Sequence, residues 1–299
     1  MVFFGSQKAQ ERDSNLEPRL SGSQDYPLGY SEQEARRLAD QGALLEDLPK
    51  DILQRAGVAH GMRVLDIGCG VGDVSLLAAR IVGKGGSVLG VDRASSSVET
   101  ARRRAASLGV TNLHFAETDA AALETDQRFD AIVGRLVLLY LPHPATVLRD
   151  LLRYLRPGGI VAFQEYDMST ASQVPPSELF MRTRGWILDA FTASGAHPDM
   201  GTKLFSTFLD AGLPPPSMIA STPVVGGPTA AVGYEYLARV LRSLLPLIER
   251  RGLADVSEID IDTLAGRLRN DAVANARVAF LPRVVGAWAR LPEGGAGVD

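Results

Sequence analysis

The stretch RVLDIGCGVGDVSLLAA, residues 63–79, joins an apolar run to a helical pattern through three closely spaced glycines. The apolar start predicts a buried strand, and the end predicts a helix. Gly68, Gly70 and Gly72 lie in the turn between them, where the missing Cβ lets a ligand approach the backbone. A strand, a glycine-rich turn and a helix in this order indicate a ligand-binding edge of a parallel sheet.

The residues that follow repeat this alternation of strand and helix patterns. Helical stretches separate the apolar runs, and we expect one of these helices to extend through residues 143–156 and to be closed by Pro157. Strands separated by helices pair in parallel through right-handed crossovers, which predicts a doubly wound α/β sheet. The strands predicted here are residues 63–68, 87–92, 113–119, 129–135 and 160–166, with one later strand over 217–226 and a final one within 279–291.

The chain divides into five predicted segments. A capping box at Ser31 and Glu34 opens a helical pattern after a polar lead-in, and long amphipathic stretches return late in the chain. The segments are a flexible N-terminal part (1–30), N-terminal cap helices (31–57), the alternating ligand-binding core (58–227), a helical cap insertion (228–277), and a final strand of the core with the tail (278–299).

Composition excludes several classes of protein. The formal net charge of −4 and a pI of about 5.7 give no electrostatic footprint for a nucleic acid. The single cysteine, Cys69, excludes an internal disulfide and a cysteine metal cluster, and no metal site is expected. No apolar run is long enough for a membrane span, and the polar opening does not resemble a signal peptide. We therefore expect a cytoplasmic protein.

Two acidic residues narrow down the ligand. Asp92 ends the second predicted strand 20 residues after Gly72, which is where dinucleotide-binding proteins place an acid on the ribose hydroxyls. Asp66 stands directly before the glycines. A carboxylate there would repel a pyrophosphate but attract a sulfonium and an ammonium group. S-adenosylmethionine (SAM) carries both cations and no phosphate, so the two acids favour SAM.

At this point the chain resembles a known family. The motifs VLDIGCGVGDVS, GVDRA, ETDAA, FDAIVGRLVLLYLPHP and LRPGGIVAF are similar in order and spacing to those of class I SAM-dependent methyltransferases. The resemblance covers residues 60–168 and is strongest to small-molecule enzymes of the ubiquinone-biosynthesis type and to bacterial natural-product tailoring enzymes. It implies a Rossmann-like sheet of seven strands with an antiparallel last strand, a helical cap, and a small organic acceptor in secondary metabolism. A homodimer is compatible with it.

The resemblance also implies which residues bind SAM. Asp92 is implied to accept both ribose hydroxyls, and Asp66 to bind the ammonium directly or through water. Asp119 is implied to receive the adenine amino group, with the N–H of Ala120 beside it, and Arg93 to flank the adenine. The residues implied to line the methionine part are Gly68, Cys69, Gly70 and Gly72.

Aromatic residues are the next candidates. In similar enzymes an aromatic residue of the N-terminal segment closes over SAM, which points to Tyr30 and its neighbour Tyr26, with packing of the cap as the competing explanation. Trp186, Phe191, Tyr234 and Tyr236 lie on predicted helices that could roof an acceptor pocket, although aromatic residues at helical spacing usually belong to the core.

The candidates for catalysis lie after the fourth and fifth strands. His143 could take a proton from a hydroxyl or carbon acceptor, with a surface histidine as the alternative. Glu165 and Asp167 end the fifth strand, where one carboxylate could point into the cleft and the other could be a solvated strand end. Arg135 interrupts an apolar run and needs a partner. That partner is either an internal carboxylate such as Glu165 or Asp66, or the carboxylate of SAM or of an acidic acceptor.

Other functions remain open at this stage. A cyclase or isomerase with the same fold could use the SAM site without methyl transfer, because donor motifs indicate binding and not turnover. Methylation of RNA or protein carries less weight, since basic stretches and an Asn-Pro-Pro-Tyr motif after the fourth strand are missing. A non-catalytic binding module is disfavoured because the donor motifs are intact.

Overall fold

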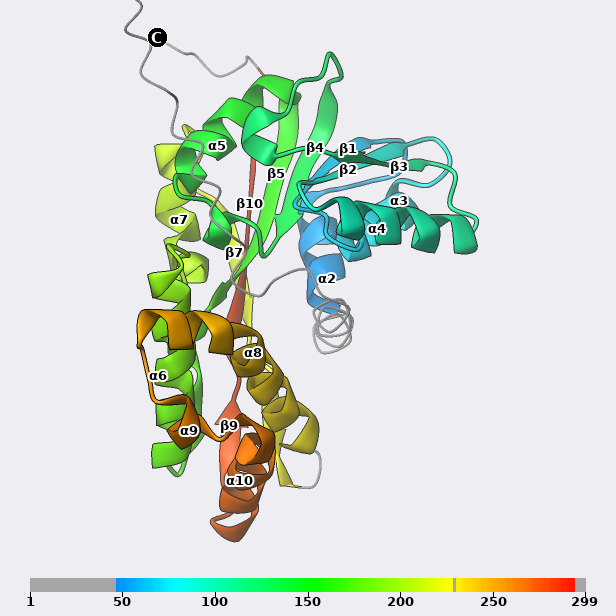
Figure 1. Cartoon of the computed structure of the whole chain (residues 1–299). Helices are drawn as coiled ribbons and strands as arrows, with labels where there is room; N and C mark the ends of the chain where they lie inside the picture. Colours follow the sequence, from blue (N-terminus) through cyan, green and yellow to red (C-terminus); the bar gives the residue numbers. More distant parts are fainter. Residues whose placement is uncertain (1–46, 228–229, 294–299) are drawn as a thin grey trace, which may run out of the picture.

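The structure is a computed structural model that describes residues 47–227 and 230–293. Its centre is a seven-stranded sheet in the order β3-β2-β1-β4-β5-β10-β7 (Figure 1). Neighbouring strands are parallel except for β10, which is antiparallel to both β5 and β7. This confirms the predicted sheet. The strands are β1 (Arg63–Ile67), β2 (Ser87–Asp92), β3 (Leu113–Glu117), β4 (Phe129–Arg135), β5 (Leu155–Asp167), β7 (Ser217–Ser221) and β10 (Arg283–Arg290).

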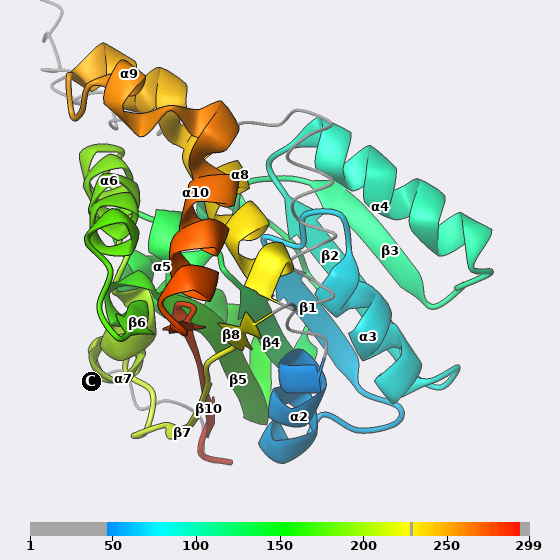
Figure 2. The ribbon, with the colours of Figure 1, turned by 90° about the horizontal axis from the view of Figure 1, so that it is seen from below.

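Helices cover both faces of this sheet. Figure 2 shows α2, α3 and α4 on one face and α5 and α7 on the other. The central strands are therefore buried on both sides, and most of their residues are apolar, as in parallel sheets between helices. The helices are α2 (Asp47–Ala56), α3 (Asp73–Val82), α4 (Ser95–Ser107), α5 (Pro144–Leu151) and α7 (Met200–Asp210).

Strand β5 begins earlier than the sequence predicts. The helix expected to reach Pro157 ends at Leu151, and the backbone of Leu155 already pairs with Phe129 of β4. Proline lacks the N–H that a helix needs, and Gly158 has a φ of +72°. The chain therefore leaves the helix before the proline and enters the sheet.

A second group of elements, here called the cap, adjoins the far end of β5. It contains a small three-stranded sheet in the order β6-β9-β8, with α6 packed against α8 and α8 against α10. The sequence did not predict this sheet. Its elements are α6 (Glu178–Ala193), α8 (Ala230–Arg251), α9 (Val256–Ile259), α10 (Ile261–Ala274), β6 (Ser172–Val174), β8 (Val224–Gly226) and β9 (Val278–Phe280).

Two prolines explain why the sequence missed the cap sheet. The strand predicted over 217–226 divides at Pro223 into β7 of the main sheet and β8 of the cap. The final strand divides in the same way at Pro282 into β9 and β10. A residue without an N–H interrupts the ladder, so each apolar run serves two sheets.

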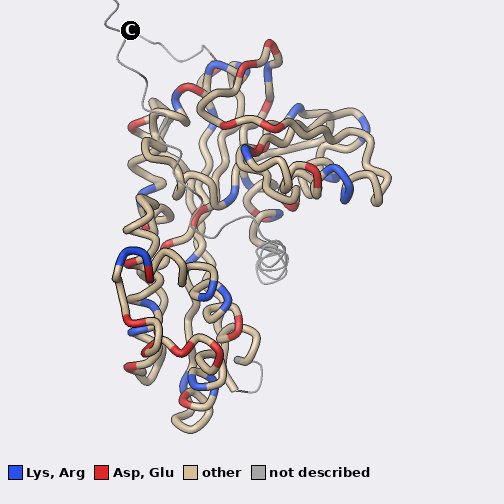
Figure 3. The backbone as a smooth tube through the Cα atoms, in the orientation of Figure 1, with Lys and Arg blue, Asp and Glu red and all other residues tan. Residues whose placement is uncertain are grey.

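The cap and the main sheet share one continuous apolar core. Several short connections join them, because β5 leads into β6, β7 into β8 and β9 into β10. Acidic and basic residues are interspersed over both parts (Figure 3). Over the part of the chain that the structure describes, the longest apolar helices fall short of what a membrane span requires.

Candidate active site

The three glycines of the loop after β1 have different surroundings. Gly68 has a φ of +63°, and a Cβ there would lie 2.4 Å from Cγ2 of Val137. Gly72, with a φ of +88° at the start of α3, packs against Phe115 and Ala101 in the same way. Gly70 has a φ of +52°, and a Cβ there would meet nothing within 4 Å. Two glycines therefore serve close packing, and Gly70 borders open space.

Asp92 holds the tip of this loop from the neighbouring strand. One of its carboxylate oxygens accepts the N–H of Gly70 at 2.8 Å, and the other accepts the N–H of Ala94 at 2.9 Å. A carboxylate oxygen has two lone pairs, so each can still accept a hydroxyl from a ligand. Asp92 is thus placed between the glycine loop and the turn after β2.

Asp66 lies beneath the same loop and is almost fully buried. Its Oδ2 accepts the hydroxyl of Ser75 at 2.5 Å, whereas its buried Oδ1 has no hydrogen-bond partner among the described residues. Burial raises the pKa of Asp66 to about 7. A buried oxygen without a donor is costly, and a cationic group from a ligand would remove that cost. The site therefore fits the ammonium that the sequence predicts.

Arg135 pairs with a carboxylate that the sequence analysis did not name. Its Nη2 lies 3.0 Å from Oδ2 of Asp73, the first residue of α3, and its side chain is 13% exposed. Asp73 also binds Arg104, with 2.8 Å between Nη1 and Oδ1. The expected internal partners, Glu165 and Asp66, were wrong: Glu165 accepts backbone N–H groups, Asp66 accepts the hydroxyl of Ser75, and Arg135 pairs with Asp73 instead.

Glu165 fixes the loop after β4, which corrects its interpretation as a catalytic base in the cleft. The side chain is fully buried, and Oε1 accepts the N–H groups of Val137 at 3.0 Å and Leu138 at 2.8 Å. Oε2 accepts the N–H of Leu139 at 3.4 Å. Burial raises the pKa of Glu165 to about 8, against the opposing effect of these bonds. Leu136, just before this group, has a φ of +56°.

The strand register reveals a polar row that sequence analysis missed in part. Asp66 pairs with Val133, two residues before Arg135, and Arg135 pairs with Gln164, so the three polar side chains share one face of the sheet. Gln164 is 3% exposed, and its Nε2 has no partner among the described residues. A glutamine inside the apolar run IVAFQEY was the signal that could have identified it.

The predicted adenine side of the site is more open. Asp119 is exposed, and its Oδ1 caps the short helix that follows by accepting the N–H of Ala121 at 2.8 Å. Ala120 is half-buried and Arg93 is exposed. Cys69 is buried beside the loop, and burial raises the pKa of its thiol, so this residue fills space as a neutral group.

The remaining sequence candidates lie apart from this group. His143 is exposed at the start of α5, and its side chain makes no capping bond to that helix. The interpretation of Asp167 as a solvated strand end was wrong: it is buried and accepts hydroxyls from Ser169, at 2.5 Å, and from Thr202. Tyr26 and Tyr30 lie outside the described residues.

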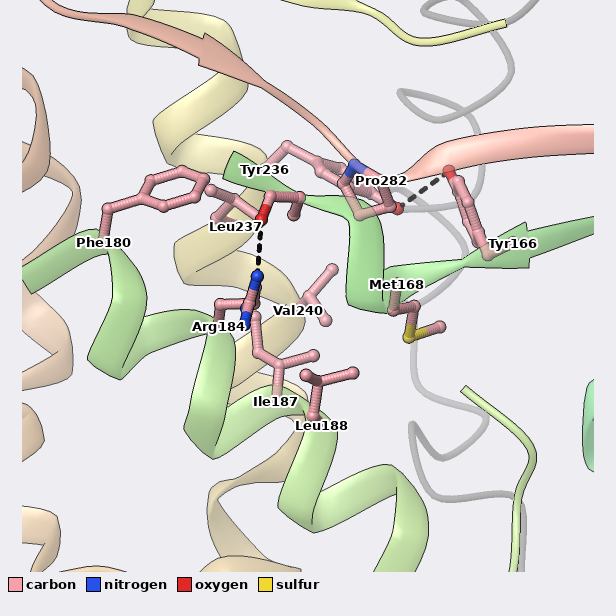
Figure 4. Close-up of a pocket in the computed structure, with 11 residues that line it drawn as sticks. Tyr166, Met168, Phe180, Arg184, Ile187, Leu188, Tyr236, Leu237, Val240 and Pro282 are labelled. Carbon is pink, nitrogen blue, oxygen red and sulfur yellow. Dashed lines mark hydrogen bonds between the residues drawn. The ribbon is translucent and has the colours of Figure 1, made fainter. Parts of the chain in front are cut away.

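A cavity opens where the cap meets the carboxyl end of β5, and its empty space of about 470 Å³ includes open solvent (Figure 4). Tyr166 of β5 and Tyr236 of α8 line it, with their hydroxyl oxygens 3.3 Å apart. Of the aromatic residues considered from the sequence, Tyr236 alone is among the lining residues, and Trp186, Phe191 and Tyr234 are buried. The lining residues are Tyr166, Met168, Ala171, Phe180, Arg184, Ile187, Leu188, Tyr236, Leu237, Val240 and Pro282.

The described residues contain no cluster of side chains suited to bind a metal ion. Within residues 47–227 and 230–293, no group of three or more histidine, cysteine, aspartate or glutamate side chains is placed to hold a metal ion.

Comparison with known proteins agrees with this fold. A family model described as a methyltransferase domain matches residues 59–191. The ubiquinone/menaquinone biosynthesis C-methyltransferase UbiE of Pseudomonas putida is 30% identical over 177 residues, which cover 54% of this chain and 69% of that protein.

Two solved structures are similar in fold. The YcgJ protein of Bacillus subtilis is 18% identical, with a TM-score of 0.54 over 81% of this chain and 97% of that chain. The [4+2]-cyclase SpnF is 21% identical, with a TM-score of 0.52 over 82% of this chain and 81% of that chain. The strand order, the family model and the similarity to UbiE lead to one conclusion: the chain belongs to the class I SAM-dependent methyltransferases, enzymes that use SAM as the methyl donor.

Proposed function

We propose that this chain methylates a small, largely apolar organic acceptor that binds in the cavity between α6 and α8. One observation carries the proposal: the glycine loop and the cavity lie at the same edge of the sheet. Strands β1, β4 and β5 are parallel, so their carboxyl ends meet there. Tyr166, at the cavity, is two residues beyond Gln164 on the face that also carries Asp66 and Arg135.

The donor is assigned to the glycine loop. Asp66 would bind the ammonium of SAM through its unpartnered Oδ1, and Asp92 would accept the ribose hydroxyls. Gly70 leaves the backbone accessible beside them. SAM supplies a methyl group already activated by a sulfonium, so the chain has to align donor and acceptor and exclude water.

The acceptor is assigned to the cavity because of its lining. Small-molecule pockets are usually apolar, with a few polar groups that fix orientation. Here those groups are the hydroxyl pair of Tyr166 and Tyr236 and the side chain of Arg184. The resemblance to tailoring enzymes supports an acceptor from bacterial secondary metabolism as part of the same proposal.

The donor assignment is tested by titrating S-adenosylhomocysteine (SAH) into the protein in a calorimeter. Asp92→Ala should weaken binding by about 1–3 kcal/mol, because a charge-assisted contact to the ribose is lost. Glu117→Ala is the matched control, since Glu117 is the exposed acid that pairs in register with Asp92 on β3. Equal affinities of the three proteins would contradict the assignment.

The acceptor assignment is tested by filling the cavity. Leu188→Trp should leave SAH binding unchanged and abolish SAH release when the enzyme is incubated with SAM and a panel of phenolic and enolic aromatic acceptors. The native enzyme should release SAH with at least one of them. Full turnover by Leu188→Trp would place the acceptor elsewhere. Conversion of an acceptor to an isomer without SAH release would favour the cyclase alternative, for which the likeness to SpnF shows the fold alone.

A further inference from the structure

Arg184 is the only ionised side chain among the residues that line the cavity. It lies on α6 at the wall of the cavity (Figure 4), and its Nη1 donates to the carbonyl oxygens of Ala171 at 2.9 Å and Ser169 at 3.2 Å. Its Nε is buried without a hydrogen-bond partner, and no carboxylate of the described residues lies within ion-pair distance. The guanidinium is therefore held by neutral carbonyl groups and has no counter-ion among the described residues.

This arrangement differs from that of two other arginines, Arg182 and Arg135. Arg182, two residues earlier on the same helix, pairs with Glu258, with 2.5 Å between Nη2 and Oε1. Arg135, the half-buried arginine of the donor site, pairs with Asp73. A cation beside apolar surface is stable only when a partner or water compensates its charge. At Arg184 that partner is missing from the surroundings that the structure describes.

The other lining residues indicate what kind of molecule would carry an anionic partner for Arg184. Figure 4 shows Arg184 and the Tyr166–Tyr236 pair on different sides of the cavity, with the aliphatic side chains of Ile187, Leu188 and Val240 nearby. None of the lining residues is an aspartate, glutamate, histidine, lysine or cysteine, so the hydroxyls of Tyr166 and Tyr236 are the only side-chain groups of the cavity wall that could act as a general base. An acceptor that is already an anion needs no such base.

We propose that the acceptor is an apolar molecule carrying an anionic group, and that Arg184 selects it by pairing with that group. This proposal rests on the proposed function, because it specifies the acceptor that the cavity takes. Arg184 acts here as a specificity-determining residue. The apolar body of the acceptor contacts the aliphatic wall, and the anion provides the counter-ion that the guanidinium lacks.

Two fluorescent probes of nearly identical shape test the proposal. 1-Anilinonaphthalene-8-sulfonate is an apolar anion, and N-phenyl-1-naphthylamine is the same aromatic framework without the sulfonate. The native protein should bind the sulfonate more tightly than the neutral probe. Arg184→Met should weaken sulfonate binding about tenfold, the size of one charge-assisted hydrogen bond, and leave the neutral probe unchanged.

Three variants make the result specific. Arg182→Met removes a charge from the same helix outside the cavity and should change neither affinity. Arg184→Lys keeps the charge and should retain the preference for the sulfonate, which a purely structural role of Arg184 in holding residues 169–171 would not predict. Leu188→Trp should displace both probes, and any fluorescence that remains with it measures binding at other surfaces.

The outcomes separate this proposal from the proposed function. Equal affinities of the native protein for both probes, or an unchanged sulfonate affinity in Arg184→Met, would overturn the anionic acceptor and leave the cavity as the acceptor site. Failure of both probes to bind, with normal SAH binding, would overturn the cavity assignment itself. If Arg184→Met does not fold, two measurements still test the anionic acceptor: the preference of the native protein for the sulfonate over the neutral probe, and the retention of this preference in Arg184→Lys.

Discussion

The donor loop and the acceptor cavity lie at one edge of one sheet, yet they are built in opposite ways. The donor loop is a short, continuous stretch whose backbone is held in place by a carboxylate of the neighbouring strand, as between Gly70 and Asp92. The cavity is assembled from β5, α6, α8 and Pro282, which are far apart in sequence, and its wall is largely aliphatic. The donor side depends on backbone geometry and the acceptor side on side-chain packing.

This difference implies different tolerance to change. A loop that needs positive φ values and close backbone approach allows few substitutions. An apolar wall tolerates swaps of similar volume, which change the shape of the cavity more than the stability of the fold. The same sheet can therefore keep one donor while its acceptor changes.

The largest expected effect lies within the donor loop itself. Gly68→Ala should lower the free energy of unfolding by about 2–5 kcal/mol, because a left-handed alanine is strained and its Cβ would collide with Val137. Gly70→Ala faces open space and should cost only about 1–2 kcal/mol, yet it should weaken SAH binding. Urea unfolding and calorimetry measure the two effects. Equal stability of the two variants would contradict the division of the glycines into packing and ligand-facing positions.

The next effect concerns Glu165 of β5, whose carboxylate holds the loop after β4, between the donor loop and the cavity. Glu165→Ala should lower the free energy of unfolding by about 3 kcal/mol, since several buried N–H groups lose their acceptor. Glu165→Gln should cost about 1 kcal/mol, because an amide oxygen can still accept from Val137 and Leu138.

The pH dependence of stability checks the same residue. With its pKa raised to about 8, Glu165 binds more protons in the folded than in the unfolded state between about pH 4.5 and pH 8. Its contribution should therefore make the free energy of unfolding fall as pH rises through this window. Glu165→Gln should flatten that slope, and an identical slope in the variant would contradict the raised pKa.

The contrast also explains what the sequence could predict. Glycines, Asp66 and Asp92 are close in sequence or end adjacent strands, so their spacing alone places them together. The partner of Arg135 was missed because Asp73 lies in the first turn of α3. No local sequence pattern specifies which side of that turn faces β4. Tyr166, Arg184 and Val240 meet only through tertiary packing of the cap, and their individual patterns are those of ordinary core or surface residues.

A smaller effect should appear in the pH dependence of donor binding. The pKa of Asp66 is about 7 in the free protein, and an ammonium group attracts only the ionised form. Affinity for SAH should therefore rise by about tenfold between pH 6 and pH 8, with protons released on binding. Calorimetry in buffers of different ionisation enthalpy measures both quantities. Asp66→Asn should bind more weakly and without this dependence, and a native affinity that is flat with pH would contradict the contact.

The smallest effect is expected from Arg135, whose charge stands between the two regions. Arg135→Met keeps the length of the side chain and removes its ion pair with Asp73. The Asp73 carboxylate is still neutralised by Arg104. We expect a loss of about 1 kcal/mol in the free energy of unfolding. The pair is largely shielded from water, which makes its loss measurable, but Asp73 keeps its second ion pair, with Arg104, which limits the loss.

Donor binding should change little, and in a specific direction. Arg135 lowers the pKa of Asp66, so Arg135→Met should shift the pH dependence of SAH binding to higher pH while its plateau stays the same. Arg104→Met, at the more exposed partner of Asp73, is the matched control and should cost less stability. A large loss of SAH affinity on the plateau, with stability unchanged, would show that Arg135 contacts the ligand and that its pair with Asp73 opens when the donor binds.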